Sequence, residues 1–161
     1  MWNTDIKQAA TKVIEALGKA PETIATAESL TGGLLSAALT MVPGASNSMR
    51  GGVTTYATAA KNEVLGVNAD LLSHKGAVDP EVAAQMAEHV RDLFNSDWAL
   101  ATTGVAGPET QDGKPVGTVY IALTNDTETV VKECHFQGTR DEIRAATVLT
   151  SLNLFLEVYE A

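Results

Sequence analysis

Apolar positions near the start of the chain repeat with the spacing of an amphipathic helix. They are Ile6, Ala9, Ala10, Val13, Ile14 and Leu17. Steps of three and four residues place these side chains on one stripe, which predicts a helix with one buried face. Gly18 follows the last of them. Because glycine commonly follows the C-terminus of a helix, the helix is predicted to stop at this residue.

The next segment changes from helical spacing to a short β-prone run. Residues 24–27 predict a strand, and the glycine pair that ends the segment 28–33 predicts a tight turn before a helix over 34–41. Residues 51–56 predict a second strand, and residues 57–65 predict a helix that carries Lys61. The succession of strand, glycine turn and helix places a helix N-terminus beside the end of a strand.

The second half of the chain predicts elements of both kinds. Asp79 is expected to be the N-cap of a helix that begins at Pro80 and runs to about Phe94. Residues 98–103 predict a third strand, 107–115 a loop, and 116–124 with 129–136 a β-hairpin. A capping-box pattern at residues 139 and 142 predicts a final helix. Its buried stripe is expected to consist of Val148, Leu152, Phe155, Leu156 and Tyr159.

Helices and strands therefore alternate through most of the chain, with one late hairpin. This alternation predicts an α/β fold, a three-layer α/β/α sandwich with a mixed sheet of five or six strands. The 161 residues contain no internal repeat, linker or low-complexity segment. We therefore expect a single domain over residues 1–161.

Composition and charge restrict the kinds of partner. The chain has 11 Lys and Arg against 20 Asp and Glu, which gives a net charge of −9. A chain this acidic is poorly suited to bind nucleic acid or an anionic membrane surface, although one local arginine can still bind a small anion. Charged residues interrupt the first 17 positions, so no signal peptide is expected and the protein is predicted to be cytoplasmic.

The sequence lacks the common metal and phosphate motifs. Cys134 is the only cysteine, and His74, His89 and His135 lie on separate predicted elements without metal-ligand spacing, so we interpret them as ordinary histidines. The segment 107–114 resembles a phosphate loop only faintly, because five residues separate its glycines and a proline follows the lysine. No serine lies in a Gly-x-Ser-x-Gly nucleophile turn.

Three strand ends carry the side chains that could do chemistry. Ser29 lies at the predicted turn before a helix, where it could be a nucleophile beside free backbone N–H groups, or where it or Thr31 could simply cap the helix. Lys61 could be a solvated charge, and Arg140 could be an exposed or salt-bridged arginine or could bind an anion bidentately. The small residues over 102–108 form either a plain loop or part of a ligand pocket.

Taken together, these segments resemble the CinA C-terminal domain family. The first matching blocks are Thr26-Ala27-Glu28-Ser29-x-Thr31-Gly32-Gly33, Val42-Pro43-Gly44-Ala45-Ser46 and Gly51-Gly52-Val53-x-x-Tyr56-x-x-x-x-Lys61. The later blocks are Leu65-Gly66-Val67, Gly76-Ala77-Val78, Thr103-Gly104-x-Ala106-Gly107-Pro108, Lys114-Pro115-Val116-Gly117-Thr118-Val119 and Gly138-x-Arg140. The blocks follow the order of the family and extend over nearly the whole chain.

The resemblance implies an activity. Stand-alone members of the family are nicotinamide-nucleotide amidases, so the implied reaction hydrolyses nicotinamide mononucleotide to nicotinate mononucleotide and ammonia. It implies an α/β/α sandwich, a homodimer or larger homo-oligomer, and no metal or organic cofactor. The pyrophosphatase-type domain of larger members is not expected here. Two departures are visible: Leu30 replaces the usual cysteine, and residues 109–112 replace a glycine-rich loop near the site.

The resemblance also suggests a role for each site residue. Ser29 is expected to be the nucleophile and Lys61 its general base, which requires the lysine pKa to fall from about 10.4 to about 7–8. Tyr56 is expected to join this network and pass a proton to the departing ammonia. The expected substrate-binding residues are Thr31, Gly32 and Gly33 around the oxyanion, Thr103, Gly104, Ala106 and Gly107 around the nucleotide, and Arg140 at the phosphate. A nucleotide-binding module without catalysis, or an amidase for another carboxamide, remains an alternative.

Overall fold

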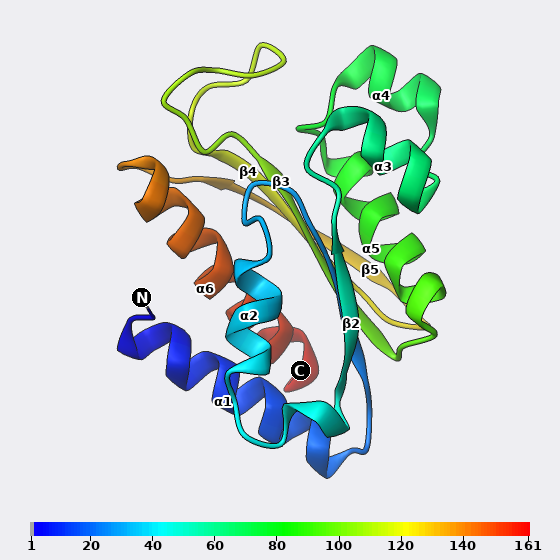
Figure 1. Cartoon of the computed structure of the whole chain (residues 1–161), viewed down its shortest axis with the longest axis vertical. Coiled ribbons are helices and arrows are strands. Elements are labelled where there is room, and N and C mark those ends of the chain that lie inside the picture. The colour runs from blue at the N-terminus through cyan, green and yellow to red at the C-terminus, as the bar shows by residue number, and fades with distance from the viewer. Residues whose placement is uncertain (1) are drawn as a thin grey trace.

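A computed structural model describes residues 2–161 as five strands and six α-helices with one 3₁₀ turn (Figure 1). In chain order the elements are α1 (Thr4–Lys19), β1 (Ile24–Glu28), α2 (Leu34–Thr40), the 3₁₀ turn (Ala45–Asn47), β2 (Met49–Thr54), α3 (Thr58–Leu65), α4 (Ala69–Lys75), α5 (Pro80–Phe94), β3 (Trp98–Gly104), β4 (Thr118–Thr124), β5 (Thr129–His135) and α6 (Arg140–Tyr159). The predicted fold class is confirmed, with five strands in the sheet.

The sheet is mixed, with the strand order β2-β1-β3-β4-β5. Strands β2, β1 and β3 are parallel, whereas β4 pairs antiparallel with both β3 and β5. Helices α1, α2 and α6 cover one face of the sheet, and α3, α4 and α5 lie on the other (Figure 1). β1, β3 and β4 are buried along nearly their whole length because helices cover both of their faces.

The order of connections creates the place where a site can form. The chain leaves β1 through α2 to reach β2 on one side, and then returns through α3, α4 and α5 to β3 on the other side. The two connections cover opposite faces of the sheet, so the chain segments that follow β1 and β2 separate at the carboxyl edge (Figure 1). Crevices at such a switch of strand order are where open α/β sheets bind their ligands.

Most predicted elements are confirmed, with shifted ends. All six apolar residues of the first helix are buried, but this helix continues through Gly18 to Lys19. Asp79 caps α5 through its side chain, and both halves of the predicted capping box are present at α6. Of the predicted α6 stripe, Val148, Leu152 and Phe155 are buried and the other two residues are half-buried.

Two differences have local physical causes. Strand β4 begins at Thr118 rather than at 116, because Gly117 adopts φ +93° and a side chain there would overlap the carbonyl oxygen of Phe136. Helix α4 was not predicted, although Asn68 caps it by accepting a hydrogen bond from the N–H of Leu71. With seven residues, it is too short for a periodic apolar pattern to be recognised. Among residues 2–161, no helix has the length and apolar character of a membrane span.

Candidate active site

Ser29 and Lys61 meet at the carboxyl edge of the sheet. Ser29 directly follows β1, and Lys61 lies in α3 after the end of the neighbouring strand β2. The Lys61 Nζ donates a hydrogen bond of 2.9 Å to the Ser29 Oγ. Residues 32 positions apart are therefore joined at the point where the sequence places a candidate nucleophile and its base.

Lys61 is an unusual lysine because its side chain is completely buried. Its Nζ also donates to the carbonyl oxygens of Thr55 at 2.6 Å and Tyr56 at 3.4 Å. Burial disfavours the charged form and lowers the pKa of Lys61 from 10.5 to about 8, while the negative charge of Asp112 acts in the opposite direction. With that pKa, about a tenth of Lys61 is neutral at pH 7.

The helix after the Ser29 turn is capped by a residue that we had not assigned to any role. The carboxylate oxygens of Glu28, which is buried, accept from the N–H groups of Leu35 at 2.8 Å and Ser36 at 3.0 Å. Neither Ser29 nor Thr31 caps α2, whose N-cap position is Gly33. Glu28 therefore satisfies the helix end and leaves the Ser29 hydroxyl for Lys61.

The turn over residues 29–33 uses only part of its backbone N–H groups. The N–H of Ser29 donates to the carbonyl of Thr102 at 3.0 Å, and that of Gly32 donates to the carbonyl of Ser29 at 3.0 Å. Gly32 therefore has no N–H to offer a substrate. In the described part of the chain, no group accepts from the N–H groups of Leu30, Thr31 or Gly33.

Two predicted site threonines direct their hydroxyls into the protein. The Thr31 hydroxyl pairs with that of Thr102 at 2.8 Å, and the Thr103 hydroxyl donates to the carbonyl of Ala77 at 2.7 Å. Both threonines are buried. The Thr31 side chain connects the turn after β1 to β3, and the Thr103 side chain connects β3 to the turn at residues 76–77. Both hydroxyls are therefore used in contacts within the protein.

Arg140 and Tyr56 meet at the rim of the site. The Arg140 guanidinium donates to the carbonyl of Gly107 at 2.6 Å and to the hydroxyl of Tyr56 at 3.0 Å. The Tyr56 side chain is 61% exposed, and its carbonyl rather than its hydroxyl contacts Lys61. No carboxylate lies within 4 Å of Arg140 among residues 2–161, so its charge is not neutralised by an ion pair.

A cavity of about 390 Å³ connects these groups. It is lined by Ser29, Leu30, Tyr56, Ala57, Thr58, Gly104, Ala106 and Gln111. The structure thus brings the turn at Ser29, the segment at Tyr56 and the small residues over 102–108 together around one cavity. Arg140 contacts this cavity through its hydrogen bond to the hydroxyl of Tyr56. Gln111 belongs to the loop that departs from the family pattern, and sequence analysis assigned it no role.

Comparisons with known proteins identify relatives of this chain. A family model described as the CinA C-terminal domain matches residues 6–159. A CinA-like protein of Frankia casuarinae is 46% identical over 88% of this chain, and one of Geobacter sulfurreducens is 48% identical over 81%. The chain spans about a third of the length of these curated relatives, 33% and 32% respectively.

Solved structures match along the whole chain. A competence/damage inducible protein from Agrobacterium tumefaciens is 35% identical with a TM-score of 0.95, and the match covers 100% of this chain and 99% of that one. A CinA superfamily protein from Escherichia coli is 31% identical with a TM-score of 0.93, covering 98% of this chain and 93% of that one.

Proposed function

The chain belongs to the CinA C-terminal domain family, and on this premise we propose that it is an amidohydrolase that converts nicotinamide mononucleotide to nicotinate mononucleotide and ammonia. The observation that carries the proposal is the 2.9 Å contact between a fully buried lysine and a serine that lines a cavity. A buried amine without a carboxylate partner is costly, and catalysis by a serine needs a base of this kind.

The hydrogen bonds of Lys61 suit its neutral form. A neutral amine has two N–H donors and one lone pair, and the two carbonyls of Thr55 and Tyr56 accept the two donors. The lone pair then faces the Ser29 hydroxyl, so the serine becomes the donor in this state. The lysine is in position to take the serine proton as the Oγ attacks the carboxamide carbon.

The reaction then proceeds in two halves. The Ser29 Oγ bonds to the carboxamide carbon, and the proton held by Lys61 passes to the nitrogen as the C–N bond breaks and ammonia leaves. This gives a Ser29 ester of the nicotinoyl group. A water molecule, deprotonated by Lys61, attacks the ester, and the proton returns to the Ser29 Oγ as the carboxylic acid leaves.

The turn after Ser29 offers donors for the tetrahedral intermediate. Its developing negative oxygen needs preorganised hydrogen bonds, and the N–H groups of Thr31 and Gly33 are not otherwise used within residues 2–161. We assign the oxyanion to these two N–H groups. Gly32 drops out of the predicted set because its N–H closes the turn onto the carbonyl of Ser29.

The direct test is ammonia release from nicotinamide mononucleotide by the purified protein. Turnover is expected with the nucleotide, and much weaker turnover with free nicotinamide, which lacks the ribose phosphate. Turnover of nicotinamide or another simple carboxamide in preference to the nucleotide would overturn the substrate assignment. Nucleotide binding by calorimetry without any ammonia release would favour the non-catalytic module.

Arg140→Ala is expected to raise KM for nicotinamide mononucleotide by on the order of 10- to 100-fold with little change in kcat. The reason is that Arg140 carries an unpaired charge at the rim, suited to the phosphate, and lies outside the Ser29–Lys61 contact. Steady-state kinetics on the nucleotide and on the phosphate-free nucleoside measure the effect. Loss of the same size on both compounds would place the phosphate elsewhere. Arg91→Ala in the last turn of α5 is the matched control, because this half-buried arginine also donates to a backbone carbonyl.

Asp112→Asn is expected to move the acidic limb of the pH–rate profile toward lower pH. Asp112 raises the pKa of Lys61 by its negative charge. Removing the charge lowers that pKa further, so a larger fraction of the lysine is neutral at pH 7 and the rate there rises. Asparagine keeps an oxygen for the N–H of Ala77, which Asp112 binds at 3.1 Å. The control is Asp126→Asn in the hairpin loop, and a limb that stays in place or moves to higher pH would contradict the expectation.

A further inference from the structure

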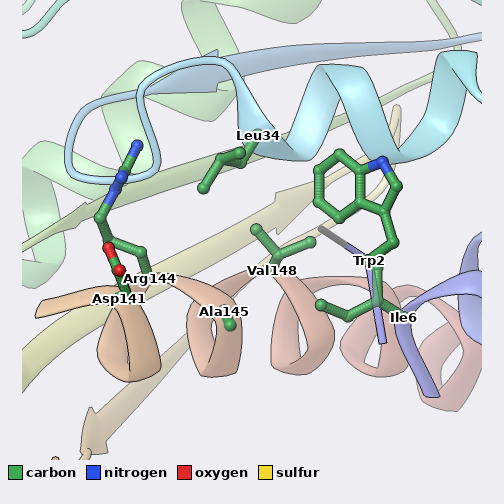
Figure 2. A pocket seen from close by; sticks show the side chains of 7 residues that line it. All are labelled: Trp2, Ile6, Leu34, Asp141, Arg144, Ala145 and Val148. Atoms are coloured by element: carbon green, nitrogen blue, oxygen red, sulfur yellow. The ribbon is translucent and has the colours of Figure 1, made fainter. Parts of the chain in front are cut away.

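Arg144, from the second turn of α6, contacts the turn that follows Ser29 and is not among the residues that line the cavity of Ser29. Its Nε donates to the carbonyl of Leu30 at 2.9 Å, and its Nη2 donates to the carbonyl of Thr31 at 3.4 Å. Figure 2 shows the side chain rising from α6 toward the loop before α2. Arg144 is half-buried and has no carboxylate within 4 Å in the described part of the chain. Its charge is therefore directed at two backbone carbonyls.

The geometry of a peptide unit connects this contact to the other side of the turn. In a trans peptide the C=O and N–H bonds point in opposite directions. The carbonyl of Leu30 and the N–H of Thr31 belong to the same peptide unit. Because Arg144 binds that carbonyl, the N–H of Thr31 points away from Arg144, and no group within residues 2–161 accepts from it.

The neighbouring groups allow this unit little freedom. The Thr31 side chain is held by Thr102, and the carbonyl of Thr31 also accepts from the N–H of Leu34 at 2.9 Å. Gly32 has φ +55°, and a Cβ at this position would lie 3.3 Å from the Arg144 Nη2. The guanidinium thus packs closely on the turn, and the positive φ favours glycine at position 32.

We propose that Arg144 is a positioning residue, which holds the Leu30–Thr31 peptide so that the N–H of Thr31 donates to the oxyanion. The proposal rests on the proposed amidase function. A cationic donor on the carbonyl also polarises the peptide unit and strengthens its N–H as a donor. Arg144 does not line the cavity of Ser29, so its proposed effect on the reaction passes through the turn.

A second cavity makes this proposal testable by chemical rescue. It has a volume of about 400 Å³ and is lined by Trp2, Ile6, Leu34, Asp141, Arg144, Ala145 and Val148 (Figure 2). Removing the Arg144 side chain would extend this space up to the carbonyls of Leu30 and Thr31. The exposed Asp141 carboxylate lines the same space and would favour a cation there. Free guanidinium therefore has both a path and a place to bind in the variant.

The experiment compares Arg144→Ala with the wild type and with Arg91→Ala. Loss of one oxyanion donor typically costs about 10²–10³ in kcat, so a misdirected donor is expected to lower kcat by about 10- to 100-fold with KM within about twofold. Millimolar guanidinium chloride should restore part of kcat in Arg144→Ala, and the same concentration of sodium chloride should not. Arg144→Lys, which keeps a cationic donor group but loses the planar guanidinium, should have a kcat between those of the wild type and Arg144→Ala.

A second reaction separates this proposal from the proposed function. Acylation of Ser29 by p-nitrophenyl acetate releases p-nitrophenolate and needs the same oxyanion donor but no nucleotide. One outcome is a wild type that is acylated but does not hydrolyse the nucleotide, while acylation is slowed in Arg144→Ala and restored by guanidinium. This outcome would support the positioning role of Arg144 and overturn the assignment of nicotinamide mononucleotide as the substrate. Unchanged kcat and acylation in folded Arg144→Ala, or loss of both without rescue, would overturn the role of Arg144. A wild type inert in both reactions would overturn both proposals.

Discussion

Ser29→Ala is expected to lower ammonia release from nicotinamide mononucleotide by on the order of 10⁴-fold or more, as removal of a catalytic serine does in other hydrolases. The change deletes one oxygen atom, the Oγ that Lys61 contacts at 2.9 Å. The backbone of Ser29 keeps its hydrogen bond to the carbonyl of Thr102, and Glu28 still caps α2. Because the fold and the cavity keep their other contacts, nucleotide affinity measured by calorimetry should change little.

The matched control for this prediction lies in the adjacent helix. Ser36→Ala also removes a hydroxyl, one that pairs with Thr26 rather than with Lys61, and keeps the N–H that Glu28 binds. It should retain turnover near the wild-type rate. Turnover by Ser29→Ala at the wild-type rate would mean that another group attacks the carboxamide. Equal loss in both variants would point to damage of the turn rather than to a missing nucleophile.

The layered fold was predictable because its signals are local and repeated. The apolar stripe of α1, the Asp79 cap of α5 and the capping box of α6 each act within one element, so their residue spacing is visible in the sequence. The strand order was not predictable, because it depends on which strand edges meet after the chain has folded. The predicted start of β4 moved because the positive φ of Gly117 excludes this residue from the extended strand.

The site was predictable in its residue types and not in its contacts. Ser29 and Lys61 could be selected as a pair only through the resemblance, because a lysine on a helix is normally a solvated charge. The pKa of this lysine is lowered by burial among segments that are distant in the sequence, and its amine contacts the carbonyl of Thr55 and the hydroxyl of Ser29. Glu28 and Arg144 were not predicted for the same reason: each acts on backbone groups, and backbone groups leave no signature in a sequence.

Lys61 connects the proposed activity to stability, because its burial lowers the pKa that a general base needs and also destabilises the folded state. Lys61 ordinarily titrates near 10.5, and the folded protein lowers its pKa to about 8. A group whose pKa is lower in the folded state binds protons more tightly when unfolded, so protonation favours unfolding. Burial of the protonated lysine therefore lowers the free energy of unfolding. This destabilisation is complete below pH 8, decreases between pH 8 and 10.5, and is absent above that range. It corresponds to about 3 kcal/mol.

Lys61→Met should therefore have two effects that appear together. Without the base, ammonia release should fall by on the order of 10⁴-fold. In the same variant the free energy of unfolding loses the pH dependence that Lys61 gives the wild type. The difference between variant and wild type should shift by about 3 kcal/mol in favour of the wild type as the pH rises from 7 to above 10.5. Subtracting the wild type from the variant at each pH removes the contribution of the other titrating groups. Comparing that difference between pH values removes the pH-independent cost of the lost hydrogen bonds.

Denaturant unfolding at a series of pH values measures this effect, with Lys7→Met on the exposed face of α1 as the control. The control should follow the wild type at every pH, because the Lys7 side chain is exposed and its removal leaves Lys61 buried. A difference for Lys61→Met that does not change with pH would mean that Lys61 keeps an ordinary pKa and has almost no neutral form at pH 7. It could not then accept the Ser29 proton, and the amidase mechanism would need another base. A pH-dependent difference together with retained turnover would instead leave the buried lysine as a structural group and remove it from the reaction.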